Sequence, residues 1–134
     1  MKSLAGAILI AGLIAGCGLN VQLPDLFLLT RTGQGPPLTL LVNDGGTIRC
    51  NGGKAKQLSD PLLIQARDLA SDLDNDAKMG LNIPRAPDTV AMYRIRLQHG
   101  TISFPDTAGA RRKELAEAEL FAVTAAQKAC GLPG

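Results

Sequence analysis

Residues 93–104, with the sequence YRIRLQHGTISF, decide the predicted fold. Apolar and polar side chains alternate over the first five of them, which indicates a strand with one buried face. The His99-Gly100 pair predicts a tight turn, and the last four residues continue as the partner strand of an antiparallel hairpin. Successive side chains of a strand point to opposite faces, so Arg94 and Arg96 are expected to face away from the core.

Three further strands are predicted upstream of this hairpin. They cover residues 25–32, 38–43 and 47–51, and segments rich in glycine, proline and aspartate separate them. The second and third form a hairpin, because the Asp-Gly-Gly sequence between them tolerates the positive φ of a tight turn. Gly52-Gly53 is expected to end the third strand.

Two amphipathic helices are also predicted. The first begins near Ser59, a helix-capping residue type, and its apolar stripe recurs at helical spacing as far as Ala77. The second covers residues 108–129 and is capped by Asp106 or Thr107. The order β-ββα-ββα predicts the α+β class, with a small antiparallel sheet of about five strands and two helices packed on one face.

The N-terminal segment has the layout of an export signal. A positive charge precedes an apolar run over residues 4–16, which is shorter than the roughly 20 residues that a membrane span needs. The run ends in IAGC at residues 14–17, which resembles the lipobox of bacterial lipoproteins. The resemblance implies cleavage between Gly16 and Cys17 and acylation of the Cys17 sulfur.

This resemblance divides the chain into a signal peptide (1–16), a lipidated tether (17–24) and a single domain (25–134). It implies a protein on the extracytoplasmic side of a cell membrane, held there by the lipid on Cys17, because two or more acyl chains anchor a protein stably. The alternatives for the same residues are an ordinary signal peptide and a buried apolar helix with an incidental cysteine.

The chain contains three cysteines, an odd number for an exported protein. Assigning Cys17 to the lipid leaves Cys50 and Cys130, which an oxidising compartment would favour as a disulfide. Two separate buried thiols are the alternative. We expect no metal site, because the chain has one histidine and no CxxC motif.

A catalytic site is not predicted either. Nucleophilic catalysis needs a nucleophile, a base and an orienting group, and His99, the only histidine, falls in a predicted turn. The sequence lacks GxGxxG and Walker motifs, so we expect no nucleotide cofactor. A small hydrolase that uses His99 with a serine or an aspartate stays open, and it requires a pocket that contains His99.

An acidic series lies within the first predicted helix. Asp68, Asp72 and Asp76 are spaced four residues apart, which places them on one helix face. A solvated acidic face is the expected role, and weak cation binding is the alternative. The segment does not follow the calcium-loop pattern, because Ala77 and Ile83 occupy the positions that would require glycine and glutamate.

A basic surface is predicted on the outer face of the sheet. The alternation places Arg94, Arg96 and Arg49 on this face, and Arg31 could join them. Guanidinium groups there could meet anionic lipid heads or acidic envelope polymers, although an uncovered sheet face is often simply polar. The net charge is +2, which gives no reason to expect a nucleic-acid partner.

The sequence therefore predicts a membrane-anchored envelope lipoprotein with a small non-catalytic domain that binds an envelope protein or an anionic polymer. An alternative is a protease inhibitor, since the order of hairpins and helices with a late disulfide distantly resembles subtilisin-inhibitor-like proteins. That family carries more cysteines and a reactive loop braced by a disulfide. Here Cys50 and Cys130 alone remain for pairing, so no loop is clearly braced.

Overall fold

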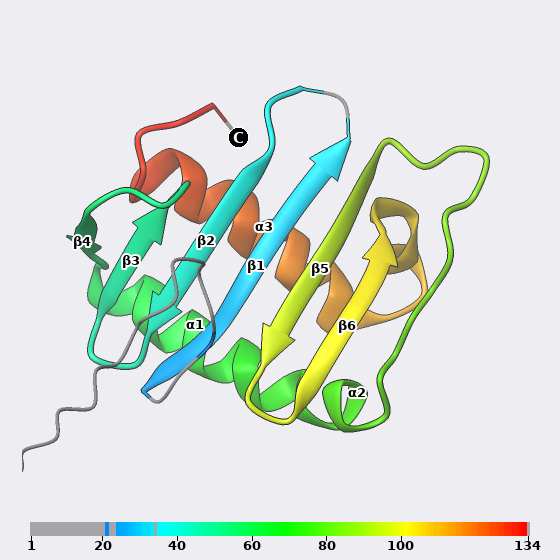
Figure 1. Ribbon diagram of the computed structural model, residues 1–134, viewed down its shortest axis with the longest axis horizontal. Coiled ribbons are helices and arrows are strands. Elements are labelled where there is room, and N and C mark those ends of the chain that lie inside the picture. The colour runs from blue at the N-terminus through cyan, green and yellow to red at the C-terminus, as the bar shows by residue number, and fades with distance from the viewer. Residues whose placement is uncertain (1–20, 22–23, 34, 134) are drawn as a thin grey trace, which may run out of the picture.

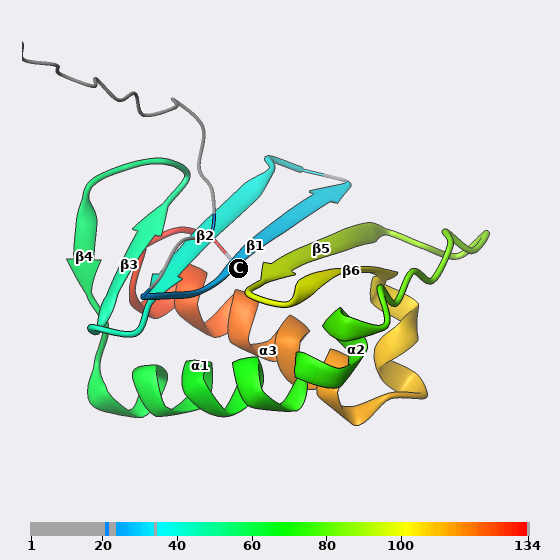
Figure 2. The ribbon, with the colours of Figure 1, turned by 60° about the horizontal axis from the view of Figure 1, so that its bottom comes forward.

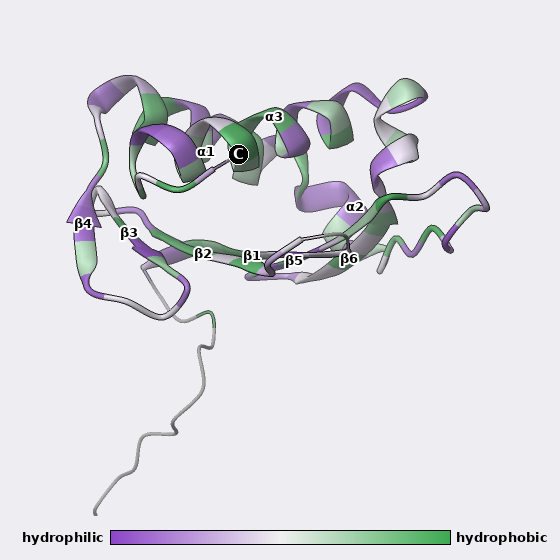
Figure 3. Cartoon of the chain, turned by 90° about the horizontal axis from the view of Figure 1, so that it is seen from above, coloured by the Kyte–Doolittle hydropathy of each residue, from purple (hydrophilic) through white to green (hydrophobic). Residues whose placement is uncertain are grey.

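The computed structural model describes Val21, residues 24–33 and residues 35–133. They form one antiparallel six-stranded sheet in the order β4-β3-β2-β1-β5-β6 (Figure 1). The described helices all cover one face of the sheet, and none of them lies on the other face (Figures 2 and 3). The strands are β1 (Asp25–Gly33), β2 (Leu38–Asn43), β3 (Thr47–Cys50), β4 (Ala55–Gln57), β5 (Ala91–Leu97) and β6 (Gly100–Pro105). The helices are α1 (Asp60–Asp72), α2 (Asp74–Lys78), α3 (Lys113–Lys128) and the 3-10 helix η1 (Asp106–Ala110).

The predicted α+β class and the two hairpins are confirmed. β1 lies in the middle of the sheet and pairs with β2 on one side and β5 on the other. The β2–β3 and β5–β6 hairpins therefore flank the first strand. Two layers result, and each hairpin presents one face to the helices and one to the outside.

β4 is a strand that the sequence analysis did not predict. Instead of ending the sheet, Asn51 and Gly52 adopt positive φ values of 53° and 74°, and the Gly53 amide donates to the Cys50 carbonyl at 3.0 Å. This geometry reverses the chain in two residues, as an Asn-Gly pair commonly does. All three β4 residues are exposed. A three-residue strand whose one apolar side chain, Ala55, is exposed gives no hydrophobic alternation to detect.

The first predicted helix is two helices in the structure. The Ser59 hydroxyl accepts from the Leu62 amide at 3.4 Å, so the predicted N-terminus is confirmed. α1 then ends at Asp72, and the chain continues through Leu73 into α2. The apolar stripe remains in the core through this break, since Leu73 and Ala77 are both buried.

The last helix starts later than predicted. Residues 106–110 form η1, and α3 begins only at Lys113, with no side chain capping its first turn. The prediction of a cap by Asp106 or Thr107 is therefore wrong. The Asp106 carboxylate instead accepts from the amides of Val90 and Ala91 at 3.0 and 3.3 Å, where it holds the start of β5.

The core lies between the sheet and the helices and is mainly aliphatic. Two aromatic pairs occur within it. Phe27 of β1 meets Phe121 of α3 edge-on with ring centroids 5.7 Å apart, and Tyr93 stacks on Phe104 at 5.3 Å. Both geometries are favourable for aromatic rings. The Phe27–Phe121 contact fixes α3 over the centre of the sheet.

Candidate binding surfaces

Cys50 and Cys130 are brought together and joined by a disulfide. Their Cα atoms are 6.0 Å apart across a sequence separation of 80. The bond ties the segment that follows α3 to the end of β3. Lys56 of β4 reinforces this junction, because its Nζ donates to the Cys130 carbonyl at 3.4 Å.

The predicted signal peptide and anchor lie outside the described residues. This holds for the cleavage position between Gly16 and Cys17 and for the acylated sulfur of Cys17. Within residues 24–33 and 35–133, no helix is both long and apolar enough to span a bilayer.

Three of the four predicted arginines lie on the open face of the sheet. Arg94 and Arg96 are exposed, while their strand neighbours Tyr93, Ile95 and Leu97 are buried on the helix side. The exposed Arg49 of β3 follows the buried Ile48 in the same way. In the described part of the chain these three guanidinium groups make no ion pair, and the Arg49 guanidinium donates only to the Gly53 carbonyl at 3.3 Å.

The strand register arranges these arginines in two neighbouring rows. One row crosses four strands through Arg49, Leu41, Leu28 and Arg96. Three strand spacings separate the first and last of these residues, so their Cα atoms lie about 14 Å apart. Arg94 lies two residues from Arg96 in the next row. The first row therefore carries positive charge at both ends, and the two leucines between them are buried (Leu28) or partly buried (Leu41).

Arg31 does not belong to this face. It is paired with Tyr93 in the β1–β5 register, and directly opposed residues of antiparallel strands share a face. The Arg31 guanidinium interacts with the Tyr93 hydroxyl on the helix side. The apolar run at the start of β1 explains the error, because the neighbouring Leu28 and Leu29 are both buried and give no alternation.

His99 lies in the β5–β6 turn, and its side chain is 56% exposed. Its Nδ1 is 2.7 Å from Oδ1 of Asp74 on α2, and Lys78 contacts the other oxygen of Asp74 at 3.0 Å. Ser71 lines the same shallow hollow of about 280 Å³. Among the described residues no hydrogen bond joins the Ser71 hydroxyl to His99, so the three groups do not form a relay in this arrangement.

A second acidic group lies where α2 meets the start of α3. Asp76 is 6% exposed, and Arg112 approaches its Oδ1 at 3.5 Å. Its Oδ2 has no partner within the described chain. Burial, then the neighbouring Glu114 carboxyl group, raises the pKa of Asp76 to about 6. The prediction that Asp76 shares an exposed face with Asp68 and Asp72 is wrong, because the helix breaks between them.

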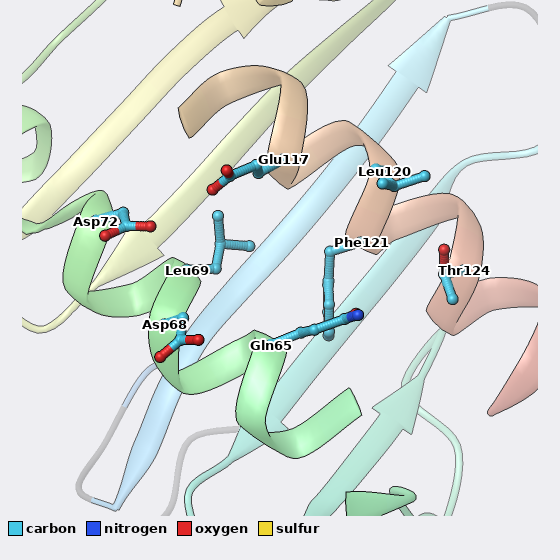
Figure 4. A pocket seen from close by; sticks show the side chains of 8 residues that line it. All are labelled: Gln65, Asp68, Leu69, Asp72, Glu117, Leu120, Phe121 and Thr124. Carbon is cyan, nitrogen blue, oxygen red and sulfur yellow. The ribbon is translucent and has the colours of Figure 1, made fainter. Parts of the chain in front are cut away.

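Asp68 and Asp72 instead line a groove between α1 and α3 (Figure 4). The groove has a volume of about 350 Å³. Leu69 and Phe121 form its floor, and Glu117 of α3 lies across from the two aspartates. The contribution of α3 was not predicted, because its residues Glu117 and Leu120 belong to no recognised motif. The remaining lining residues are Gln65 and Thr124.

Comparison with known proteins finds no relative of this chain. The chain matches no protein-family model, no curated protein and no solved structure.

Proposed function

We propose that this chain is a lipid-anchored envelope protein whose domain binds an anionic partner through the open face of its sheet, without catalysis. The anchor rests on the resemblance of residues 14–17 to a lipobox. The binding surface rests on Arg49, Arg94 and Arg96. Arginine suits this role because its planar guanidinium is always charged and matches phosphate and carboxylate groups in geometry.

The observation that carries the proposal is the lack of compensating charge around these side chains. Arg67 and Arg112 are held in ion pairs with Asp44 and Asp76, whereas the three open-face arginines have no such partner among the described residues. Exposed positive charges on one surface attract anions most strongly when no neighbouring carboxylate neutralises them.

The proposed tether keeps this surface close to the membrane. Eight extended residues from Cys17 to Pro24 span at most about 28 Å. The domain would therefore work near anionic lipid head groups and the polymers attached at the envelope surface. Each basic side chain near an anionic surface contributes about 1 kcal/mol to binding.

Titration with inorganic polyphosphate tests this surface. The membrane-extracted protein would be reconstituted in nanodiscs of zwitterionic lipid, and binding would be measured by calorimetry. We expect Arg94→Gln with Arg96→Gln to weaken binding by about 2 kcal/mol, roughly thirtyfold. The matched control is Arg85→Gln, which removes an exposed arginine from the connector before β5. Equal affinities of the double variant and the control would show that Arg94 and Arg96 do not bind the anion.

A serine hydrolase is the competing function, because Ser71, Asp74 and His99 line one hollow. The proposal that the domain is not catalytic predicts no covalent labelling by a fluorophosphonate probe. Labelling that Ser71→Ala abolishes and Ser59→Ala leaves intact would contradict it. Ser59 is the appropriate control because it caps α1 outside the hollow.

A further inference from the structure

A third helix could pack along the groove between α1 and α3. The two helices run side by side in opposite directions over the sheet (Figures 1 and 2). Each contributes four lining residues at positions i, i+3, i+4 and i+7, beginning at Gln65 on α1 and at Glu117 on α3. Residues at this spacing form one continuous ridge along a helix. We propose that this groove docks a basic amphipathic helix of a partner protein.

The charges that line the groove define the partner's chemistry. Asp68 and Asp72 make no ion pair within the described residues, and both are exposed. Glu117 has only a loose contact with Lys113 at 3.8 Å, and the Lys113 side chain is 89% exposed. Lysine or arginine side chains of a partner could therefore pair with carboxylates on both sides of the groove.

An elongated cationic partner fits these carboxylates better than a metal ion does. In the part of the chain that the structure describes, no group of three or more acidic, histidine or cysteine side chains is placed to hold a metal. Asp68 and Asp72 are one helical turn apart along α1, and Glu117 lies on the other helix. The negative charge is thus spread along the groove, as a helical peptide with spaced cations requires.

Exposed apolar side chains supply the hydrophobic part of the recognition: Leu120 lines the groove, and Ile64 lies beside it, next to the first lining residue of α1. Leu120 of α3 is 67% exposed, and Ile64 of α1, one turn before Asp68, is 56% exposed. The floor residues Leu69 and Phe121 are already buried. The apolar surface that a partner would cover therefore belongs mainly to Leu120 and Ile64. This combination matches a helix with an apolar stripe and basic flanks.

A second copy of this chain is a poorer occupant for the groove. A two-fold dimer would bring the same surface of both copies together. The carboxylates of Asp68, Asp72 and Glu117 in one copy would then lie close to the same acidic set in the other, and like charges at short distance repel. A different protein is therefore the better occupant of the groove.

A pair of designed peptides tests the proposal. The first carries leucine at i, i+3, i+4 and i+7 with lysine on both flanks, and the second has glutamate in place of every lysine. Anisotropy of each labelled peptide would be measured against the lipidated protein in nanodiscs of zwitterionic lipid, with empty nanodiscs as background. We expect the lysine peptide to bind at least tenfold more tightly and to weaken as salt rises. Equal binding of both peptides would overturn the proposal.

Variants of the protein then assign the binding to the groove. Asp68→Asn with Asp72→Asn should weaken the lysine peptide about tenfold, while Asp88→Asn, in the exposed connector, should not. Leu120→Ser should also weaken it, whereas Met79→Ser removes a comparably exposed apolar side chain outside the groove and should have no effect. Unchanged binding by both groove variants would refute the assignment. A dimer in sedimentation that Leu120→Ser dissociates would give the groove to a second copy and refute it equally.

Discussion

The His99 imidazole on the β5–β6 turn lies 2.7 Å from the Asp74 carboxylate on α2. The other hairpin is tied in the same way, because Arg67 of α1 binds Asp44 in the β2–β3 turn through Nε at 2.7 Å. Arg67 also donates through Nη2 to the Asp44 carbonyl oxygen at 2.8 Å, so each hairpin turn is joined to the helix layer by polar contacts. Both contacts are solvent-exposed, and they give His99 a structural partner on the helix layer.

Removing the His99 contact should have a small effect on stability. The pair is largely solvent-exposed, and exposed ion pairs contribute little. We expect His99→Ala and Asp74→Asn each to lower the Tm by a few degrees at most, and the double variant to lower it no further than the sum of the two. Thermal unfolding followed by circular dichroism measures this. Loss of the folded state in His99→Ala would show that the turn depends on the contact far more than its exposure implies.

Gly100, which directly follows the β5–β6 turn, should tolerate substitution poorly. It has a φ of 156°, and a Cβ added there would overlap the carbonyl oxygen of Ala77 on α2. We expect Gly100→Ala to lower the free energy of unfolding by more than about 2 kcal/mol. Gly35→Ala is the control, since a Cβ at that position meets open space despite a positive φ. Similar destabilisation of both variants in urea would mean that backbone strain, and not the close approach to α2, sets the effect.

Two carboxyl groups should make the domain more stable in mild acid. Burial and the nearby Asp106 raise the pKa of Glu119 to about 7, and burial and Glu114 raise that of Asp76 to about 6. Both values lie above those of the unfolded chain, so the native state binds more protons between about pH 4 and pH 7. Stability should therefore fall as the pH rises through this window.

The matched amides identify the groups responsible for this pH dependence. Asp76→Asn and Glu119→Gln should each flatten the dependence of Tm on pH between 5 and 8, because neither amide titrates. Asp88→Asn, in the exposed connector, should leave the slope unchanged. A wild-type protein that is more stable at pH 8 than at pH 5 would contradict the sign of the effect.

The disulfide should contribute a large share of the domain's stability. Joining Cys50 to Cys130 closes a loop of about 80 residues, for which chain-entropy models give about 4 kcal/mol. We expect Cys50→Ala with Cys130→Ala to lower the urea midpoint strongly, and a reductant to have the same effect on the wild type alone. If the reductant leaves the wild-type midpoint unchanged, the two sulfurs are not bonded in the native protein.

The elements that the sequence predicted are those that bury a clear apolar pattern. The alternation over residues 93–97 gave the orientation of Arg94 and Arg96, and the stripe ending at Ala77 gave the inner side of the first helical segment. β4 was not predicted because it has three residues and buries none of them, so it shows no alternation. The start of α3 was misplaced because Asp106 has the residue type of a cap but hydrogen-bonds to the start of β5.

The candidate surfaces also differ in whether a local sequence pattern could predict them. The open sheet face follows from the period of two in a strand, so three of its arginines could be found from sequence. Arg31 could not be placed, because its position depends on its pairing with Tyr93 across β1 and β5. The groove depends on which ridge of α3 meets α1, and this relationship between distant segments leaves no local pattern in either helix.

The mass of the intact protein extracted from membranes shows whether Cys17 carries the lipid anchor. We expect a chain that begins at Cys17, carries a glyceryl group with at least two acyl chains, and lacks two hydrogen atoms because Cys50 and Cys130 are bonded. A product that retains residues 1–16, or that begins elsewhere with an unmodified Cys17, would contradict the anchor and the envelope role built on it.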